Sequence, residues 1–98
     1  SGFTQMVYKI NGYKILRDAK DQATQGTTLS FIEESEPGDL AFFHNDNDEI
    51  IHVGIILKDN HIIHASGKVR IDRLDQSGIY NNEKNKHTHS LRYIKKII

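Results

Sequence analysis

The segment Ile50–Leu57 constrains the fold of this chain more than any other part of the sequence. It is rich in isoleucine and valine, which favour extended backbone, so it predicts a strand. A very short polar break separates it from a second apolar segment, His61–Ala65. Consecutive strands joined by so short a loop pair antiparallel, as a hairpin. We therefore expect an antiparallel sheet that includes this hairpin.

Two histidines, His52 and His64, bear on the length of the hairpin loop. Facing residues of an antiparallel pair share a side of the sheet, so a two-residue loop would place these imidazoles on opposite faces. A loop over 58–60 would instead pair His64 with Gly54 and place His52 on the same face, as a diagonal neighbour. Such loops often end in the left-handed conformation, which Asn60 tolerates. We expect this odd loop, or an equivalent bulge, and expect Gly54 to leave room for another element near the histidines.

The first part of the chain predicts two helices. Apolar residues at helical spacing mark one face of the first helix: Phe3, Met6, Val7 and Ile10. Asn11-Gly12 is typical of a helix end, and the segment Tyr13–Leu16 is predicted to be extended. Asp18 is expected to be the N-cap of a short second helix that stops near Gly26.

Strands dominate the rest of the expected fold. Besides the hairpin, the predicted strands are Asp39–Phe43, Val69–Leu74 and Leu91–Ile97. The remaining segments are a connector at Thr27–Glu36, a turn at Pro37-Gly38 and a polar loop, with at most one helical turn, at Ser77–Lys86. Helices followed by antiparallel strands indicate an α+β fold, with the N-terminal helices packed on the sheet. We expect residues 1–98 to form a single domain.

Composition excludes several classes of partner. The counts of basic and acidic residues are equal, 13 and 13, so the chain lacks the basic excess typical of proteins that bind nucleic acid or anionic membranes. No apolar run approaches the roughly 20 residues of a membrane span. The sequence has no cysteine, which excludes disulfides and thiolate metal sites within it. We expect no cofactor and no metal ion.

A histidine pair near the start of a helix suits one kind of chemistry. A thiol at a helix N-terminus has a lowered pKa, because it lies at the positive end of the helix dipole. A nearby imidazole can hold it as a thiolate, and a second polar residue can orient that imidazole. In this chain His52 would be the base and His64 the orienting residue.

Four segments of the chain resemble the NlpC family of bacterial cell-wall cysteine peptidases. They are Ser1-Gly2-Phe3-Thr4, Pro37-Gly38-Asp39-Leu40, His52-Val53-Gly54-Ile55 and Ile63-His64-Ala65-Ser66, in the order that the family has them. The resemblance implies a papain-like fold, with His52 as the catalytic histidine and His64 as the third polar residue. It also implies hydrolysis of murein peptides, at the bond between γ-D-glutamyl and a diamino acid.

The resemblance extends to the expected peptide-binding pocket. In members that cut after γ-D-glutamate, the residue after the cysteine and an aspartate ahead of a short helix line this pocket. These positions correspond to Ser1 and Asp18. The residue after that aspartate is often serine in the family but is Ala19 here, so one hydrogen bond to the substrate is expected to be absent.

The nucleophile is the main departure from the family pattern. The family's cysteine and the aspartate before it belong immediately ahead of Ser1, and neither is in the sequence. We expect a catalytic domain truncated just after its nucleophile, from a protein of the bacterial cell envelope or a secreted one, in which upstream cell-wall-binding domains are possible. A cytoplasmic role in recycling wall peptides is also possible. The alternatives are an inactive module that binds a wall peptide or a protein, and an amidase or acyltransferase with the same triad.

The other histidines carry less information. His61 would lie on the face opposite to His64 and is interpreted as structural. His87 and His89 could share one side of a strand as a metal pair, but spacing places no third ligand beside them.

Overall fold

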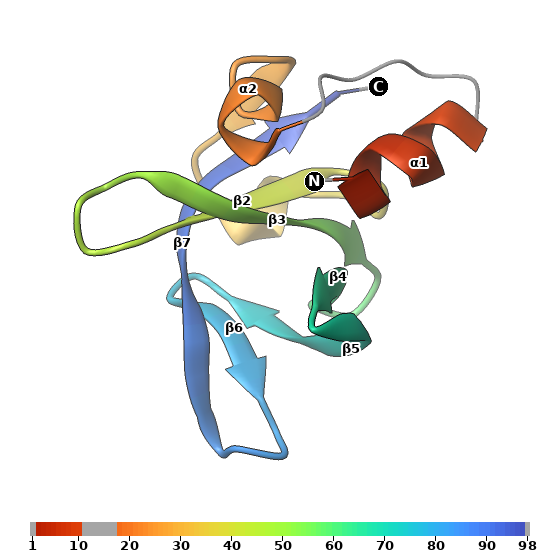
Figure 1. Ribbon diagram of the computed structural model, residues 1–98. Helices are drawn as coiled ribbons and strands as arrows, with labels where there is room; N and C mark the ends of the chain where they lie inside the picture. Colours follow the sequence, from red (N-terminus) through yellow and green to blue (C-terminus); the bar gives the residue numbers. More distant parts are fainter. Residues whose placement is uncertain (1, 11–17, 98) are drawn as a thin grey trace.

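The computed structural model describes residues 2–10 and 18–97, with the backbone alone at Ile10 (Figure 1). The helical elements are α1 (Gly2–Ile10), α2 (Ala19–Gln22) and a 3₁₀ turn, η1 (Ile32–Glu34). The strands are β1 (Thr27–Leu29), β2 (Leu40–His44), β3 (Ile50–Leu57), β4 (His61–Ser66), β5 (Lys68–Asp75), β6 (Gly78–Asn81) and β7 (Lys86–Lys96). The predicted helix end at Asn11-Gly12 and the extended segment Tyr13–Leu16 lie outside the described residues.

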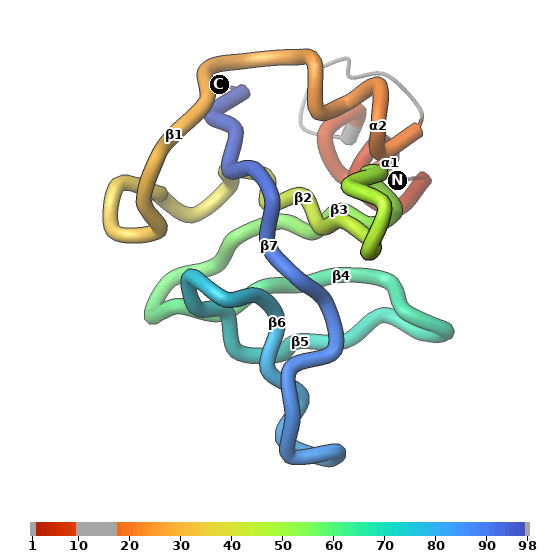
Figure 2. The backbone as a smooth tube through the Cα atoms, turned by 90° about the vertical axis from the view of Figure 1, so that its left-hand side faces the viewer, coloured from red at the N-terminus to blue at the C-terminus, as the bar shows by residue number. Residues whose placement is uncertain are grey.

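The seven strands form one antiparallel sheet that closes on itself. Their order is β1-β7-β2-β3-β4-β5-β6, and β6 pairs back with β7. Closure depends on the length of β7, which has 11 residues. Its N-terminal half pairs with β6 and its C-terminal half pairs with β2 and β1, as its course in Figure 2 shows. The sequence predicted the antiparallel sheet and the α+β class, but it did not predict a small barrel.

The strand β6 corrects the loop predicted at Ser77–Lys86. Gly78 opens this strand with φ of +143°, a conformation that L side chains rarely adopt. A Cβ at Gly78 would lie 1.8 Å from the carbonyl oxygen of His89 on β7. Glycine is therefore required at this position, because β6 and β7 could not approach each other so closely with any side chain here. The last strand begins five residues earlier than predicted, at Lys86, since it pairs with β6.

The segment between the helices and β2 also differs from the prediction. Thr27–Leu29 is a strand that pairs with the end of β7, and Ile32–Glu34 is a 3₁₀ turn, within the segment that the sequence predicted as a connector. The helix α2 ends at Gln22, before the predicted limit near Gly26. Asp18 occupies the N-cap position with extended backbone, but its side chain makes no capping hydrogen bond.

The sheet buries apolar side chains on both faces. On the outer face, Tyr8 of α1, Ala19 of α2 and Ala23 directly after α2 pack with residues of β2 and β3: Leu40, Phe42, Val53 and Ile55. Inside the barrel the buried residues are Ile32, Ala41, Phe43, Ile56, Ile62, Leu74, Ile79 and Ile94. The two helices therefore pack on the outer face of the sheet, mainly against β3, and the barrel has its own apolar interior.

The apolar stripe predicted for α1 is only partly correct. Phe3 and Val7 pack on the outer cluster, but Met6 is 53% exposed. Thr4 and Tyr8 are buried instead. The Thr4 hydroxyl donates a 2.9 Å hydrogen bond to Gln22 of α2, and the Tyr8 hydroxyl donates to the carbonyl of Gly38. Burial beside Asp39 raises the pKa of Tyr8 to about 12, so it stays a donor. The buried face of α1 therefore differs from the predicted apolar face, because polar partners on neighbouring elements bury other side chains of the helix.

The hairpin of β3 and β4 has the predicted register. Three residues, 58–60, separate the strands, and Gly54 pairs with His64. Asp59 and Asn60 both have φ of 58°, the left-handed conformation. Parity of the sheet therefore places His52 and His64 on one face, which is the inner face. Within the part of the chain described here, no helix is long and apolar enough to cross a membrane.

Candidate active site

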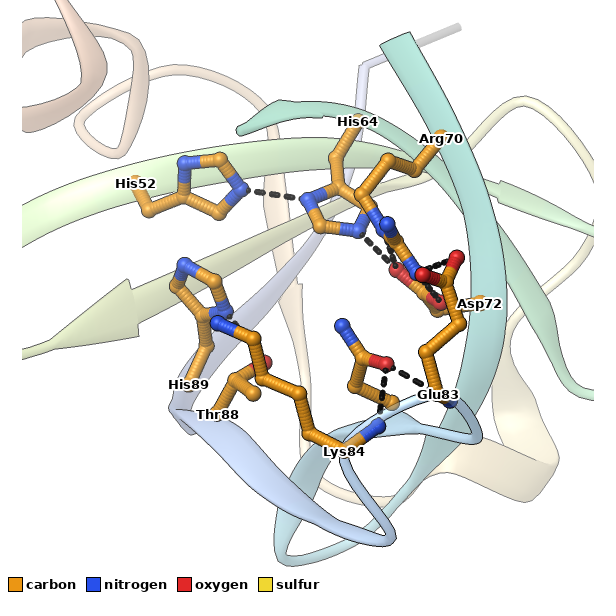
Figure 3. A network of polar contacts seen from close by, with 9 residues as sticks. His52, His64, Arg70, Asp72, Glu83, Lys84, Thr88 and His89 are labelled. Atoms are coloured by element: carbon orange, nitrogen blue, oxygen red, sulfur yellow. Dashed lines mark hydrogen bonds and ion pairs between the residues drawn. The ribbon is translucent and has the colours of Figure 1, made fainter. Parts of the chain in front are cut away.

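The inner face of the β3–β4 hairpin brings the two histidines into contact. Nε2 of His52 lies 2.8 Å from Nδ1 of His64, and the ring planes are nearly perpendicular, at 83° (Figure 3). Hydrogen-bond length and ring geometry together show one linked pair. Among the residues that the structure describes, none forms a hydrogen bond to Nδ1 of His52.

The other end of the pair is anchored to β5. Nε2 of His64 lies 2.7 Å from Oδ2 of Asp72, and both side chains are almost fully buried, with 1% and 5% of their surface exposed. β4 and β5 pair so that Ile62 faces Asp72 and His64 faces Arg70. Asp72 is therefore a diagonal neighbour of His64 on the inner face, the same relation that His52 has across β3.

Arg70 holds the carboxylate of Asp72 from the side. Its Nε donates to Oδ2 at 3.0 Å and its Nη2 donates to Oδ1 at 3.1 Å. The Arg70 hydrogen bonds are the main cause of the lowered pKa of Asp72, with His64 adding to it against the opposing effect of burial. Arg70 also lies 3.1 Å from Glu83, in the turn between β6 and β7. The carboxylate is therefore an anion fixed from two directions.

A third imidazole, His89 of β7, completes the cluster. Its ring stacks on that of His52, with centroids 4.3 Å apart and planes inclined by 26°. Burial is the main cause that lowers the pKa of His52, to about 3, and the nearby His89 and His64 add to the effect. Burial also lowers the pKa of His89. His52 is therefore neutral at physiological pH, so its ring carries one hydrogen and one lone pair.

The position of α1 differs in one respect from the expectation. The helix contacts β3 and β4, the strands that carry the two histidines. However, it packs against Val53, Ile55 and Ile63, which lie on the face opposite to the imidazoles. Gly54 does not leave room for the helix. A Cβ there would lie 2.6 Å from Cδ1 of Ile62, so the absence of a side chain accommodates Ile62 in the barrel.

Of the two expected substrate-binding residues, the structure describes only Asp18. Ser1 lies outside the described residues. Asp18 is exposed at the start of α2, and it takes no part in the hydrogen bonds that link the histidines. The substrate-binding roles of both residues stay predictions.

His87 and His89 do not form a metal pair. His89 points into the cluster with His52, whereas Nε2 of His87 lies 2.8 Å from Asp75 on the surface. Within residues 2–10 and 18–97, no group of three or more potential ligands is arranged to hold a metal ion. His61 pairs with Arg73 of β5, on the face opposite to His64 as its parity predicts.

Sequence reasoning missed Asp72, Arg70 and His89. The signal for the first two was present in β5, where Arg70 and Asp72 alternate with Val69 and Ile71. In the structure the polar residues face inward, and the apolar ones are more than half exposed. Hydropathy alone would place the apolar residues inward and the polar ones outward. Only the pairing register with His64 shows that the polar residues face inward.

Comparison with known proteins is consistent with this geometry. The chain is 37% identical over 67 residues to a γ-D-glutamyl-L-lysine dipeptidyl-peptidase of Bacillus subtilis (strain 168). The match covers 66% of this chain and 22% of that protein, so the chain spans about a fifth of the length of this curated relative.

Solved structures share the fold. The crystal structure of an NlpC/P60 family protein from Bacillus cereus ATCC 10987 has a TM-score of 0.78 and 26% identity, over 98% of this chain and 30% of that one. RipD of Mycobacterium tuberculosis, described as a non-catalytic NlpC/p60 domain protein adapted to peptidoglycan binding, has a TM-score of 0.67 and 17% identity. That match covers 96% of this chain and 62% of RipD, and at this identity it concerns the fold alone.

The sequence model of the NlpC/P60 family matches residues 1–91, which is nearly the whole chain. The chain therefore belongs to the NlpC/P60 family.

Proposed function

We propose that this chain is most of the catalytic domain of a cysteine endopeptidase that hydrolyses bacterial cell-wall peptides. The observation that carries the proposal is the contact of 2.8 Å between His52 and His64, which engages Nε2 of His52 and leaves Nδ1 without a hydrogen bond from the described residues. Membership of the NlpC/P60 family and the activity for which the Bacillus relative is named support the same substrate class. The bond expected to be cut lies between γ-D-glutamyl and a diamino acid.

The nucleophile in this proposal is a cysteine that immediately precedes Ser1. Its thiol gives its proton to Nδ1 of His52, and the thiolate attacks the carbonyl carbon of the scissile bond. Backbone N–H groups at the start of α1 would stabilise the oxyanion that forms. The protonated His52 then donates its proton to the leaving amine, and water hydrolyses the thioester with His52 again acting as base. In this scheme Ser1 and Asp18 bind the peptide, and His64 orients His52.

The test uses the polypeptide extended upstream through the expected cysteine. L-Ala-γ-D-Glu-diamino acid peptides should be cleaved, with thiol-alkylating reagents abolishing the reaction. His52→Ala should abolish it as well. A matched control is His61→Ala, which changes a histidine on the same hairpin but on the opposite face. Full cleavage by the His52→Ala protein, or resistance of the activity to thiol alkylation, would contradict the proposal.

A second candidate function is binding of a cell-wall peptide or a protein without catalysis. The structural neighbour RipD, which is described as a non-catalytic domain adapted to peptidoglycan binding, supports this candidate. The two candidates separate in the same experiment, because a binding module would retain the peptide in equilibrium dialysis without releasing any product. The amidase or acyltransferase alternative predicts loss of substrate with a different product, which mass spectrometry of the reaction identifies.

The place of action belongs to the same proposal. A protein that acts on murein peptides would work in the bacterial cell envelope or outside the cell, or in the cytoplasm on recycled wall peptides. Fractionation of the source bacterium with an antibody to the domain distinguishes the three.

A further inference from the structure

We infer that Asp72, held as an anion by Arg70, is a positioning residue that acts through His64 and fixes the ring proton of His52 on Nε2. The consequence is that Nδ1 of His52 is kept free to accept a proton. The catalytic meaning of this rests on the proposed function, but the proton arrangement itself is a property of the folded chain and can be tested without catalysis.

The first step concerns what Asp72 can do. Both of its oxygens accept hydrogen bonds from Arg70, at 3.0 and 3.1 Å, and the guanidinium is charged at any physiological pH. An ionised carboxylate has no hydrogen to donate. Nε2 of His64, at 2.7 Å from Oδ2, must therefore carry the hydrogen in that contact. The reverse arrangement would place two lone pairs against each other in a site that is 1% exposed at His64.

In the second step, the position of the hydrogen on His64 determines its position on His52. A neutral imidazole carries one hydrogen, so a His64 that is protonated on Nε2 presents a lone pair at Nδ1. This lone pair lies 2.8 Å from Nε2 of His52, so Nε2 of His52 must donate. The single hydrogen of a neutral His52 is then used, and Nδ1 is an acceptor.

The third step shows why Arg70 matters. A bare carboxylate beside His64 would favour a doubly protonated, cationic ring. Such a ring would donate from Nδ1 as well, and would force the proton of His52 onto its own Nδ1, where it blocks the base. Arg70 already balances the charge of Asp72 with two hydrogen bonds, and Glu83 holds Arg70 at 3.1 Å. The carboxylate of Asp72 is therefore shared between Arg70 and His64 and does not face His64 alone.

The direct test is the protonation state of each ring nitrogen in the 98-residue chain. Long-range ¹H–¹⁵N correlation spectra at neutral pH distinguish protonated from unprotonated imidazole nitrogens. We expect Nε2 of both His52 and His64 to be protonated and Nδ1 of both to be unprotonated. A wild-type spectrum with the proton of His52 on Nδ1 overturns the inference without recourse to any variant.

The Asp72→Asn variant tests the cause. An amide offers an N–H where the carboxylate offers only oxygens, so His64 loses its single arrangement. The nitrogen signals of both His64 and His52 should then move toward the average of the two tautomers. The matched control is Asp75→Asn, which alters the contact with His87 on the surface and should leave His52 and His64 unchanged. Wild-type signals at both rings in a folded Asp72→Asn protein would refute the role of Asp72.

A second variant guards against misfolding of the first. Arg70→Gln keeps the carboxylate but removes its counter-charge and its two hydrogen bonds, so the hydrogen-bond arrangement at His64 should change, and the nitrogen signals of both rings should move away from their wild-type positions. Unchanged spectra in this variant would remove Arg70 from the inference. Neither outcome depends on peptide cleavage, so failure of the inference and failure of the proposed function remain distinguishable.

Discussion

Strand β5 supplies the aspartate of two histidine–aspartate pairs, and the nitrogen–oxygen distances in these pairs are almost the same. Nε2 of His64 lies 2.7 Å from Asp72, and Nε2 of His87 lies 2.8 Å from Asp75. The first pair is inside the barrel, with 1% and 5% of the side chains exposed, and the second is on the surface, with 43% and 55% exposed. The distances in the two pairs are therefore nearly the same, and burial is what differs.

Burial changes what the same contact does. Around Asp72 the hydrogen bonds of Arg70 dominate and lower the pKa of the carboxyl group. The pKa of Asp75 is also lowered: burial acts to raise it, but hydrogen bonds from His87 and from backbone N–H groups of Ser77 and Gly78 outweigh that effect. Water can replace the partner of an exposed group, whereas a buried group that loses its partner stays unpaired. The inner pair can therefore fix the protonation of a neighbouring ring, and the outer pair cannot.

The largest expected effect is on peptide cleavage. In the polypeptide extended through the expected cysteine, His52→Ala should lower kcat/KM by roughly 10²–10⁴-fold or more, because it removes the proposed general base. His87→Ala should leave kcat/KM within about twofold, since its pair lies on the surface. Steady-state kinetics on both variants measures the contrast. Equal losses in the two variants would show that inward placement does not decide which histidine acts.

The next effect is on stability. Asp72→Asn places an amide N–H against Arg70 or His64 in a buried site, so the free energy of unfolding should fall by about 2 kcal/mol. Asp75→Asn keeps an oxygen for the backbone N–H groups of Ser77 and Gly78, and should cost about 0.5 kcal/mol or less. Urea unfolding of the two variants gives both numbers. A cost for Asp75→Asn as large as that for Asp72→Asn would contradict the role assigned to burial.

The comparison also explains which parts of the fold were predictable. The register of the β3–β4 hairpin followed from the sequence, because His52 and His64 meet only with an odd loop, and the structure has three residues there. The strand at 68–75 was predictable as a strand from its alternation. Its polar side was not identified as the inner side, because hydropathy alone says nothing about a buried carboxylate that Arg70 neutralises and His64 binds.

Closure of the barrel was not predictable by the same reasoning. It depends on β6, a short strand within a polar stretch, and on Gly78, whose lack of a side chain lets it lie against the backbone of His89. His89 carried no motif, and it reaches His52 only because β7 crosses from β6 to β2. Local sequence patterns therefore predicted one part of the candidate site, the pair of His52 and His64. The rest of the site depends on long-range strand pairing.

Acidification should weaken the fold through the inner cluster. The pKa of His52 is lowered from 6.5 to about 3, mainly by burial, so between these values the unfolded chain binds more protons than the folded one. Stability therefore rises with pH in this window, and it is lost as pH falls from 6.5 toward 3. After allowance for partial exposure of the ring, the loss between pH 7 and pH 4.5 should be about 1–2 kcal/mol.

The variant His52→Gln removes this titration and should reduce the loss. His87→Gln is the control, because the His87 pair lies on the surface. Urea unfolding of wild type and both variants at pH 7 and pH 4.5 measures the effect. An equal loss in wild type and in the His52→Gln protein would show that His52 is not kept neutral by its surroundings.

The smallest expected effect concerns the outward side of β5. Ile71 is 61% exposed although it is apolar, so Ile71→Thr should change the free energy of unfolding by no more than about 0.5 kcal/mol, and threonine keeps the preference for a strand. Leu74→Thr is the matched inward change at a side chain that is 2% exposed, and it should cost about 2–4 kcal/mol. Urea unfolding compares the two. If Ile71→Thr cost as much as Leu74→Thr, the outward side of β5 would be buried, and the inward orientation of Arg70 and Asp72 would be wrong.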